Sequence, residues 1–250
     1  DRKGKVSNAA GAVLLEGPLT RVRVLAGAKG QVLAGGDDGV VRLLGEKGRE
    51  LARRDGRPVT AVALSPDGTR AAFAWDDGTL TLWELQLNKE VSSGQGAPTA
   101  ALAFSRDGRF IAQGRADRRV ALIDALTGKE LDAAEVKTAP VSVAFSPAGD
   151  LVAVGLDRGG VMLKAPSLDE AGTFSGPNEP SRALSFSPSG ERLVAGSDDG
   201  QVYVWALPSR RLTHVLPVEA GDVPLVRFVD DEHVVIAGAD RSVRAVTLTK

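Results

Sequence analysis

The stretch VTAVALSPDGTRAAFAWDDGTLTLWEL at residues 59–85 contains three short apolar segments separated by two turn sequences. In the first turn, SPDG at residues 65–68, proline presets φ and glycine accepts a positive φ. The second turn, DDG at residues 76–78, is a hairpin turn of the Asp-Gly type. The stretch therefore predicts three antiparallel strands, and residues 89–92 predict a weaker fourth strand.

This pattern recurs along the chain, with SRDG at residues 105–108, SPAG at 146–149 and SPSG at 187–190. Two columns of residues share one period, with steps of 39–42 residues in the first and 40–44 in the second. The first column is Gly35, Ala74, Gly114, Gly155, Gly196 and Gly238, and the second is Pro18, Pro58, Pro98, Pro140, Pro180 and Pro224. Two independent columns with the same spacing predict six repeat units.

Four strands in each unit, repeated radially, predict an all-β fold: a β-propeller of six four-stranded blades with about 40 residues in each repeat. A blade has two apolar faces, and it buries them against its neighbours. We expect a leader or linker over residues 1–11 and one propeller domain over residues 12–250. The approximate repeats are 12–48, 49–87, 88–128, 129–168, 169–209 and 210–250.

The chain resembles the WD-repeat propeller family, and the repeated turns agree with this. The resemblance rests on LWEL at residues 82–85 and VWAL at residues 204–207, in the place of the family's terminal Trp-Asp pair. LIDA at residues 122–125 fills the same place without the Trp, and the family's Gly-His pair is missing from every repeat. The resemblance implies that Trp83 and Trp205 are buried between blades. It also implies that an N-terminal outer strand at residues 12–16 completes the last blade and closes the ring.

Composition excludes several classes of function. The chain has 250 residues, a formal charge of −1, no cysteine and only two histidines. The charge argues against a nucleic-acid binder, and no apolar run reaches the roughly 20 residues of a membrane helix. With no cysteine and little histidine, we expect no enzymatic activity, no metal and no cofactor. The excess of arginine over lysine favours a bacterial source, in the cytoplasm or the envelope.

Each repeat has aspartate in its second hairpin turn. One interpretation is a ring of carboxylates that binds a hard cation. The other, which we favour, is a structural role, because aspartate accepts a hydrogen bond from the backbone two residues further along. The residues expected to act in this way include Asp38, Asp77, Asp117 and Asp199.

Candidate partner-binding residues follow the small-residue column, where the type varies from repeat to repeat. In WD-repeat propellers these turns surround the mouth of the channel. The side chain of Trp75 is either a binding anchor or packed on its neighbours. The arginines either bind an acidic peptide or pair with nearby aspartates. The set is Trp75, Arg115, Leu156, Arg118, Arg158 and Arg241, with Arg21 and Arg182 as weaker candidates.

These observations favour a non-enzymatic scaffold that binds a protein or peptide, possibly acidic, on the channel-mouth face. We expect a monomer that binds no nucleic acid. One alternative is a small-ligand-binding or metal-dependent hydrolytic propeller. The other is a structural or sensory domain of a larger protein, since the chain begins at Asp1 and its only methionine is Met162.

Overall fold

The computed structural model describes residues 6–7, 13–15, 22–44, 49–164, 168–218, 221–240 and 242–248. Every regular element in these ranges is a β-strand, which confirms the all-β prediction. No helix in the described ranges is long and apolar enough to cross a membrane.

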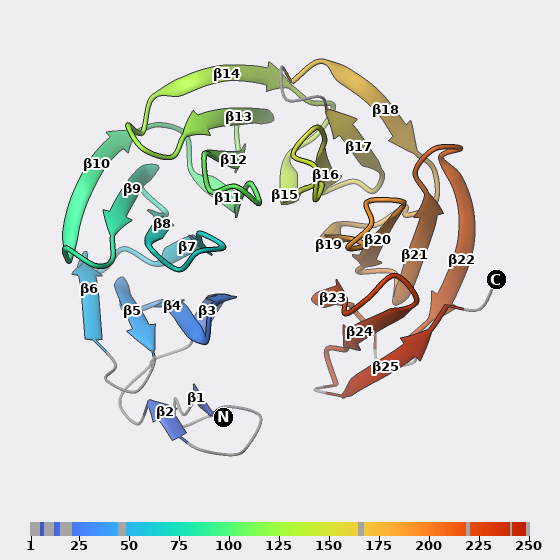
Figure 1. Cartoon of the computed structure of the whole chain (residues 1–250), viewed down its shortest axis with the longest axis horizontal. Helices are drawn as coiled ribbons and strands as arrows, with labels where there is room; N and C mark the ends of the chain where they lie inside the picture. Colours follow the sequence, from blue (N-terminus) through green and yellow to red (C-terminus); the bar gives the residue numbers. More distant parts are fainter. Residues whose placement is uncertain are drawn as a thin grey trace. The chain divides into compact units, whose positions relative to one another are not determined.

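The strands form a succession of antiparallel sheets, labelled in Figure 1, which is the repeated arrangement expected of a WD-repeat propeller. A two-stranded sheet contains β1 (Val6–Ser7) and β2 (Val13–Leu15). The four-stranded sheets are β3 (Val22–Ala28), β4 (Gln31–Gly36), β5 (Val40–Leu44), β6 (Arg49–Arg53); β7 (Val59–Leu64), β8 (Arg70–Trp75), β9 (Thr79–Glu84), β10 (Lys89–Gln95); β11 (Thr99–Phe104), β12 (Phe110–Arg115), β13 (Arg119–Asp124), β14 (Glu130–Glu135); β15 (Pro140–Phe145), β16 (Val152–Leu156), β17 (Val161–Lys164), β18 (Glu170–Phe174); and β19 (Ser181–Phe186), β20 (Arg192–Ser197), β21 (Gln201–Ala206), β22 (Arg211–Pro217). The last sheet has β23 (Leu225–Phe228), β24 (His233–Ala237) and β25 (Val243–Thr247).

The chain divides into two compact units. Unit 1 comprises Asp1–Ile111 and Ile123–Lys129, and unit 2 comprises Ala112–Leu122 and Glu130–Lys250. Unit 1 holds the sheets β3–β6 and β7–β10, and unit 2 holds the sheets β15–β18, β19–β22 and β23–β25. A single domain over residues 12–250, six blades and one ring stay predictions.

Apolar side chains from adjacent sheets pack together inside each unit. In unit 1, Phe73 and Trp75 from β8 pack with Leu33 and Val41 of the preceding sheet. In unit 2, one such core lies between the sheets β15–β18 and β19–β22, and another lies between β19–β22 and β23–β25. Both faces of these sheets carry apolar residues, and the burial of those residues between sheets stabilises the repeat.

The small-residue column is explained by close approach between sheets. A Cβ atom on Gly155 would lie 2.2 Å from the carbonyl oxygen of Ser181 on the next sheet and 2.3 Å from Oγ of Ser142. The strand register also corrects the last member of the small-residue column. Gly155 pairs with Ser142 and Val161, and the equivalent residue in the last sheet is Ala237, not Gly238.

A repeated backbone hydrogen bond fixes the equivalence of positions between sheets. In four of the described sheets, the N–H of a residue one or two positions after the second strand donates to the carbonyl of a residue that precedes the first strand of the same sheet. The bonds are Asp76 to Pro58 at 3.0 Å, Asp157 to Ala139 at 2.9 Å, Asp198 to Pro180 at 3.1 Å and Ala239 to Asp222 at 3.0 Å. Asp76, Asp157 and Asp198 therefore occupy one structural position.

The segment expected to close the ring pairs elsewhere. Residues 12–16 contain β2, which pairs with β1 inside the predicted leader, and the last sheet has only three strands in the described part of the chain. The prediction that this segment completes the last sheet is therefore wrong for these residues. A hairpin between β1 and β2 closes a short loop, which costs less conformational entropy than pairing with a strand far away in the sequence.

The turns of the SPDG type are held by their serines, as expected of a residue that repeats with the fold. The buried Oγ of Ser65 donates to Oδ1 of Asp67 at 2.6 Å and accepts from the N–H of Arg70 at 2.9 Å. The Ser65 hydroxyl and the N–H and hydroxyl of Thr69 donate to Asp67 and together hold the pKa of its carboxyl below the ordinary value.

These hydrogen bonds predict a loss of stability in acid. Because the pKa of Asp67 is lowered by folding, its contribution is present above the ordinary pKa of 3.8 and is lost as the pH falls through the folded-state value. We expect Asp67→Asn to lower the melting temperature at pH 7. Between pH 5 and about pH 3, the melting temperature of this variant should fall less than that of the parent. Thermal melts across that range are the measurement, and a variant with the parent's acid profile would contradict the assignment.

Candidate functional site

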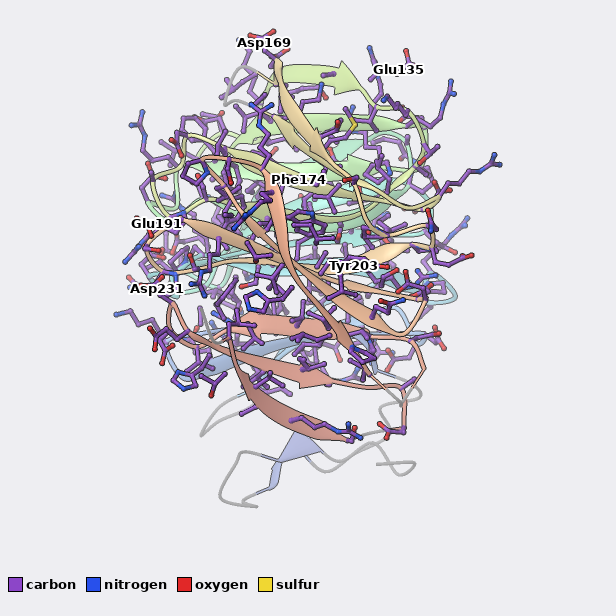
Figure 2. All side chains as sticks on the ribbon, turned by 90° about the vertical axis from the view of Figure 1, so that its right-hand side faces the viewer. Glu135, Asp169, Phe174, Glu191, Tyr203 and Asp231 are labelled. Carbon is purple, nitrogen blue, oxygen red and sulfur yellow. The ribbon has the colours of Figure 1, made fainter. Side chains whose placement is uncertain are left out.

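The predicted site residues in unit 2 lie near the turns between second and third strands. We use the name turn face for three such turns, at residues 116–118, 157–160 and 198–200, together with the adjoining Arg115 and with Arg182, which pairs with Asp198. Figure 2 shows that Glu135, which pairs with Arg118 of this face, lies on the opposite side of the unit from Glu191 and Asp231. Glu191 and Asp231 belong to the turns that join first and second strands. Unit 2 thus has two distinct turn-bearing sides, and Arg118 lies on the side of Glu135, its ion-pair partner.

Three of the four described arginines in the predicted set pair with carboxylates of their own chain. Arg115 forms an ion pair with Glu130 and also donates to Oε1 of Gln113 at 2.9 Å. Arg118 lies 3.2 Å from Glu135. These pairs match the interpretation of the arginines as residues of a charge-paired rim, although in two of the three pairs the carboxylate is glutamate rather than aspartate.

Arg182 and Arg158 differ from each other in their pairing. Arg182, the second residue of β19, pairs with the carboxylate of Asp198. Its Nε lies 2.7 Å from Oδ2 and 2.9 Å from Oδ1. Arg158 is exposed, and it has no ion pair within the described residues. Among the four described arginines of the predicted set, Arg158 is therefore the one whose charge is open to an external group.

Trp75 lies in the core of unit 1, not at its surface. Its side chain is 2% exposed, its Nε1 donates to the Gly39 carbonyl at 3.2 Å, and its ring meets Phe73 edge-on at 5.3 Å between centroids. The Arg54 guanidinium covers the ring at 4.8 Å from the centroid and lies 3.6 Å from Asp77. The interpretation as an exposed binding anchor is therefore wrong, because packing encloses the indole on its own sheet and on the preceding one.

The other predicted binding residues are placed as follows. Leu156 is buried at the end of β16, so it offers no surface to a partner. Its apolar side chain is part of the buried core of that sheet. Arg21 and Arg241 lie outside the described residues.

Hairpin aspartates stabilise their own turns at three of the four predicted positions. Asp38, Asp77 and Asp199 each accept a hydrogen bond from the N–H two residues further along, at 3.2, 2.9 and 3.0 Å. Asp38 also pairs with Arg42 at 2.9 Å. Asp117 is exposed in its turn, and its carboxylate has no hydrogen bond of this type within the described part of the chain.

The described residues include no group of three or more histidines, aspartates and glutamates arranged to hold a metal ion. The two histidines belong to different sheets, His214 to β22 and His233 to β24. His233 Nδ1 lies 2.8 Å from Asp230 beside a surface turn. His233 has no hydrogen bond to a serine within the described part of the chain, so it lacks the arrangement that nucleophilic catalysis requires.

The two tryptophans in the third strands are both packed against aromatic rings, but to different depths. Trp205 is 0% exposed, donates from Nε1 to the Ser175 carbonyl at 3.0 Å, and stacks on Tyr203. Phe174 and Tyr203, labelled in Figure 2, are its ring neighbours, at 5.2 and 6.0 Å between centroids. Trp83 is only half-buried beside Phe73.

Sequence reasoning did not find the partners of these rings. Tyr203 donates to Oδ2 of Asp199 at 2.8 Å, and burial together with this carboxylate raises the pKa of Tyr203 to about 12. Arg54, which covers Trp75, and Ser175, whose carbonyl accepts from Trp205, also lie in loops distant in sequence from these rings. The residue types alone do not predict these contacts, because the contacts depend on which loops meet after folding.

Sequence comparison supplies independent information on the family. The model of the WD domain, G-beta repeat, matches residues 48–84 and 169–206, and each range ends one residue after a third-strand tryptophan, Trp83 or Trp205. Both matched ranges run from a fourth strand into the next sheet. The WD repeat-containing protein SL1-17 of Schistosoma mansoni is 32% identical over 157 residues, which cover 62% of this chain and 52% of that protein. These matches support a WD-repeat family.

Two further relatives are named for their association with a small nuclear ribonucleoprotein or a small nucleolar RNA. The human U5 small nuclear ribonucleoprotein 40 kDa protein is 44% identical over 55 residues, which cover 22% of this chain and 15% of that protein. The Xenopus laevis U3 small nucleolar RNA-associated protein 15 homolog is 25% identical over 218 residues, 83% of this chain and 42% of that protein. The chain thus spans between about one seventh and about half of these relatives.

The comparisons correct the expectation about source and compartment. The matched relatives come from eukaryotes, so the prediction of a bacterial source is not supported. One name refers to a small nuclear ribonucleoprotein and another to a small nucleolar RNA, which contradicts the predicted bacterial cytoplasm or envelope.

Proposed function

We propose that this chain is a non-enzymatic interaction scaffold that binds a protein partner through the turn face of unit 2. The observation that carries the proposal is the charge arrangement of that face. Arg115, Arg118 and Arg182 are held by carboxylates of the chain, whereas Arg158 is exposed without such a pair among the described residues. Exposed charges on rigid turns select and orient a partner.

The relatives favour a scaffold within a multi-component particle. One is named as a component of a small nuclear ribonucleoprotein, and another as associated with a small nucleolar RNA. With a net charge of −1, we expect this chain to contact proteins of such an assembly rather than its RNA. The partner segment facing Arg158 is expected to be acidic.

The proposal is tested by affinity capture with a charge-reversed variant. Purified parent, Arg158→Glu and Arg211→Glu serve as bait for nuclear extract, and bound proteins are identified by mass spectrometry. Arg211 is exposed at the start of β22, outside the turn face, so it is a control matched in charge. We expect a partner that the parent and Arg211→Glu retain and that Arg158→Glu loses by roughly tenfold, or about 1.4 kcal/mol.

Two results would count against this proposal. Equal capture by all three proteins would remove the turn face from the interaction, provided that their melting temperatures agree. Capture that disappears after ribonuclease treatment of the extract would show that RNA, not protein, is the direct contact.

A further inference from the structure

Asp157 differs from the two aspartates that share its structural position. Asp76 in unit 1 lies 4.0 Å from Arg57, and Asp198 in unit 2 lies 2.7 Å from Arg182. Each of these aspartates thus has a guanidinium group of the chain beside it. Asp157 has no ion pair within the described residues, although its N–H makes the same backbone hydrogen bond as the other two.

The reason lies in the residues around the first strand of each sheet. Arg57 directly precedes Pro58, and the equivalent of Arg57 beside Ala139 is Thr138. Arg182 is the second residue of β19, and the second residue of β15 is Val141. The sheet β15–β18 therefore lacks an arginine at both positions from which the other sheets supply one.

The absence of both arginines leaves polar atoms of this sheet without partners. Oδ1 of Asp157 is shielded from solvent and has no hydrogen-bond partner in the described part of the chain, and the same is true of Oγ1 of Thr138. Burying a carboxylate oxygen without a hydrogen bond or a counter-charge is unfavourable. The nearby cations Lys137 and Arg158 are exposed and are not paired with Asp157.

We infer that Asp157, whose side chain is partly exposed although its Oδ1 is shielded, binds an arginine side chain of the partner protein. The two equivalent positions show that this backbone geometry places a carboxylate next to a guanidinium. A guanidinium from the partner supplies the counter-charge that this carboxylate lacks within the described part of the chain, and it can donate to the carboxylate as it does at the equivalent position. The inference rests on the proposed function and gives the partner a second feature: an arginine near the acidic group that faces Arg158.

The first test restores the missing arginine from within the chain. Thr138→Arg places the side chain where Arg57 stands in the sheet β7–β10. We expect it to raise the melting temperature by roughly 1–3 °C in the parent and not at all in the Asp157→Asn background. An equal effect in both backgrounds, or no rise in either, would overturn the inference that a cation site is vacant there.

The second test supplies the guanidinium from outside. The ¹⁵N-labelled protein is titrated with N-acetyl-arginine amide, and N-acetyl-citrulline amide is the neutral isostere. We expect saturable shifts of the Asp157 amide resonance with the arginine compound only, lost in Asp157→Asn and in Thr138→Arg but kept in Asp198→Asn. Equal shifts with citrulline, or with magnesium chloride at matched ionic strength, would overturn the assignment to arginine, as would no shift.

The two proposals fail in different ways. If capture depends on Arg158 while the arginine compound leaves Asp157 unaffected, the partner site stands and the arginine inference is wrong. If the arginine compound binds at Asp157 while Arg158→Glu captures every partner as the parent does, the site at Asp157 stands and the proposed partner face is wrong.

Discussion

Trp205→Ala is expected to reduce the free energy of unfolding by roughly 3–5 kcal/mol, the usual range for deletion of a fully buried aromatic side chain. The indole is 0% exposed, stacks on Tyr203, and satisfies the Ser175 carbonyl through Nε1. Its removal leaves a cavity between two sheets and a carbonyl without its donor. For a chain of this length we expect the melting temperature to fall by roughly 6–20 °C, measured by calorimetry.

Two variants separate the causes of that loss. Trp205→Phe keeps an aromatic ring but lacks the N–H group, so we expect a smaller loss than for alanine. Trp83→Ala removes a half-buried indole, and we expect only about 2–3 kcal/mol, less than the 3–5 kcal/mol that full burial of Trp83 would give. A loss for Trp83→Ala as large as that for Trp205→Ala would contradict the difference in depth.

Gly39→Ala is expected to destabilise unit 1 by roughly 2–5 kcal/mol, through a steric clash added to backbone strain. Gly39 has a φ of +73°, and a Cβ atom would lie 1.9 Å from the Arg54 carbonyl oxygen and 2.7 Å from that of Arg57. The Gly39 carbonyl also accepts the hydrogen bonds of Trp75 Nε1 and the Arg54 N–H. Displacement of the turn therefore disturbs a core tryptophan as well.

Gly56→Ala is the matched control for this variant. Gly56 has a similar φ of +68°, but a Cβ atom added there would meet no other atom of the described residues within 4 Å, so only the strain of a positive φ remains. We expect Gly56→Ala to cost about 1–2 kcal/mol. Chemical denaturation of both variants measures the difference, and equal losses would show that the clash at Gly39 is relieved by movement of the loop.

Much of the fold was predictable because its signals are local. The SPDG and DDG turns determine where strands end, and their serines and aspartates act within the turn, as Ser65 and Asp77 do. The small-residue column was also visible, apart from its last member, which the register moves from Gly238 to Ala237. That error arose because one residue of difference in turn length is invisible without the strand pairing.

The candidate site was harder to predict, because its properties depend on contacts between loops. Trp75 follows the small-residue column at the variable position of its repeat, yet the Gly39 turn and the Arg54 side chain enclose it. Arg115, Arg118 and Arg158 look alike in sequence, but only the folded chain shows which has a carboxylate within reach. Pairing is decided by side chains that are distant in sequence.

The sequence by itself determined the repeat, the strand order within each sheet and the local hydrogen bonds of the turns, since all of these depend on residues a few positions apart. Only the tertiary structure decided that Trp75 and Trp205 are enclosed while Trp83 is half-buried, and that Arg158 is open. It alone also showed that Asp157, among the described residues, lacks the cation that its equivalents have. Burial and charge pairing are properties of surfaces that meet only after the sheets have packed.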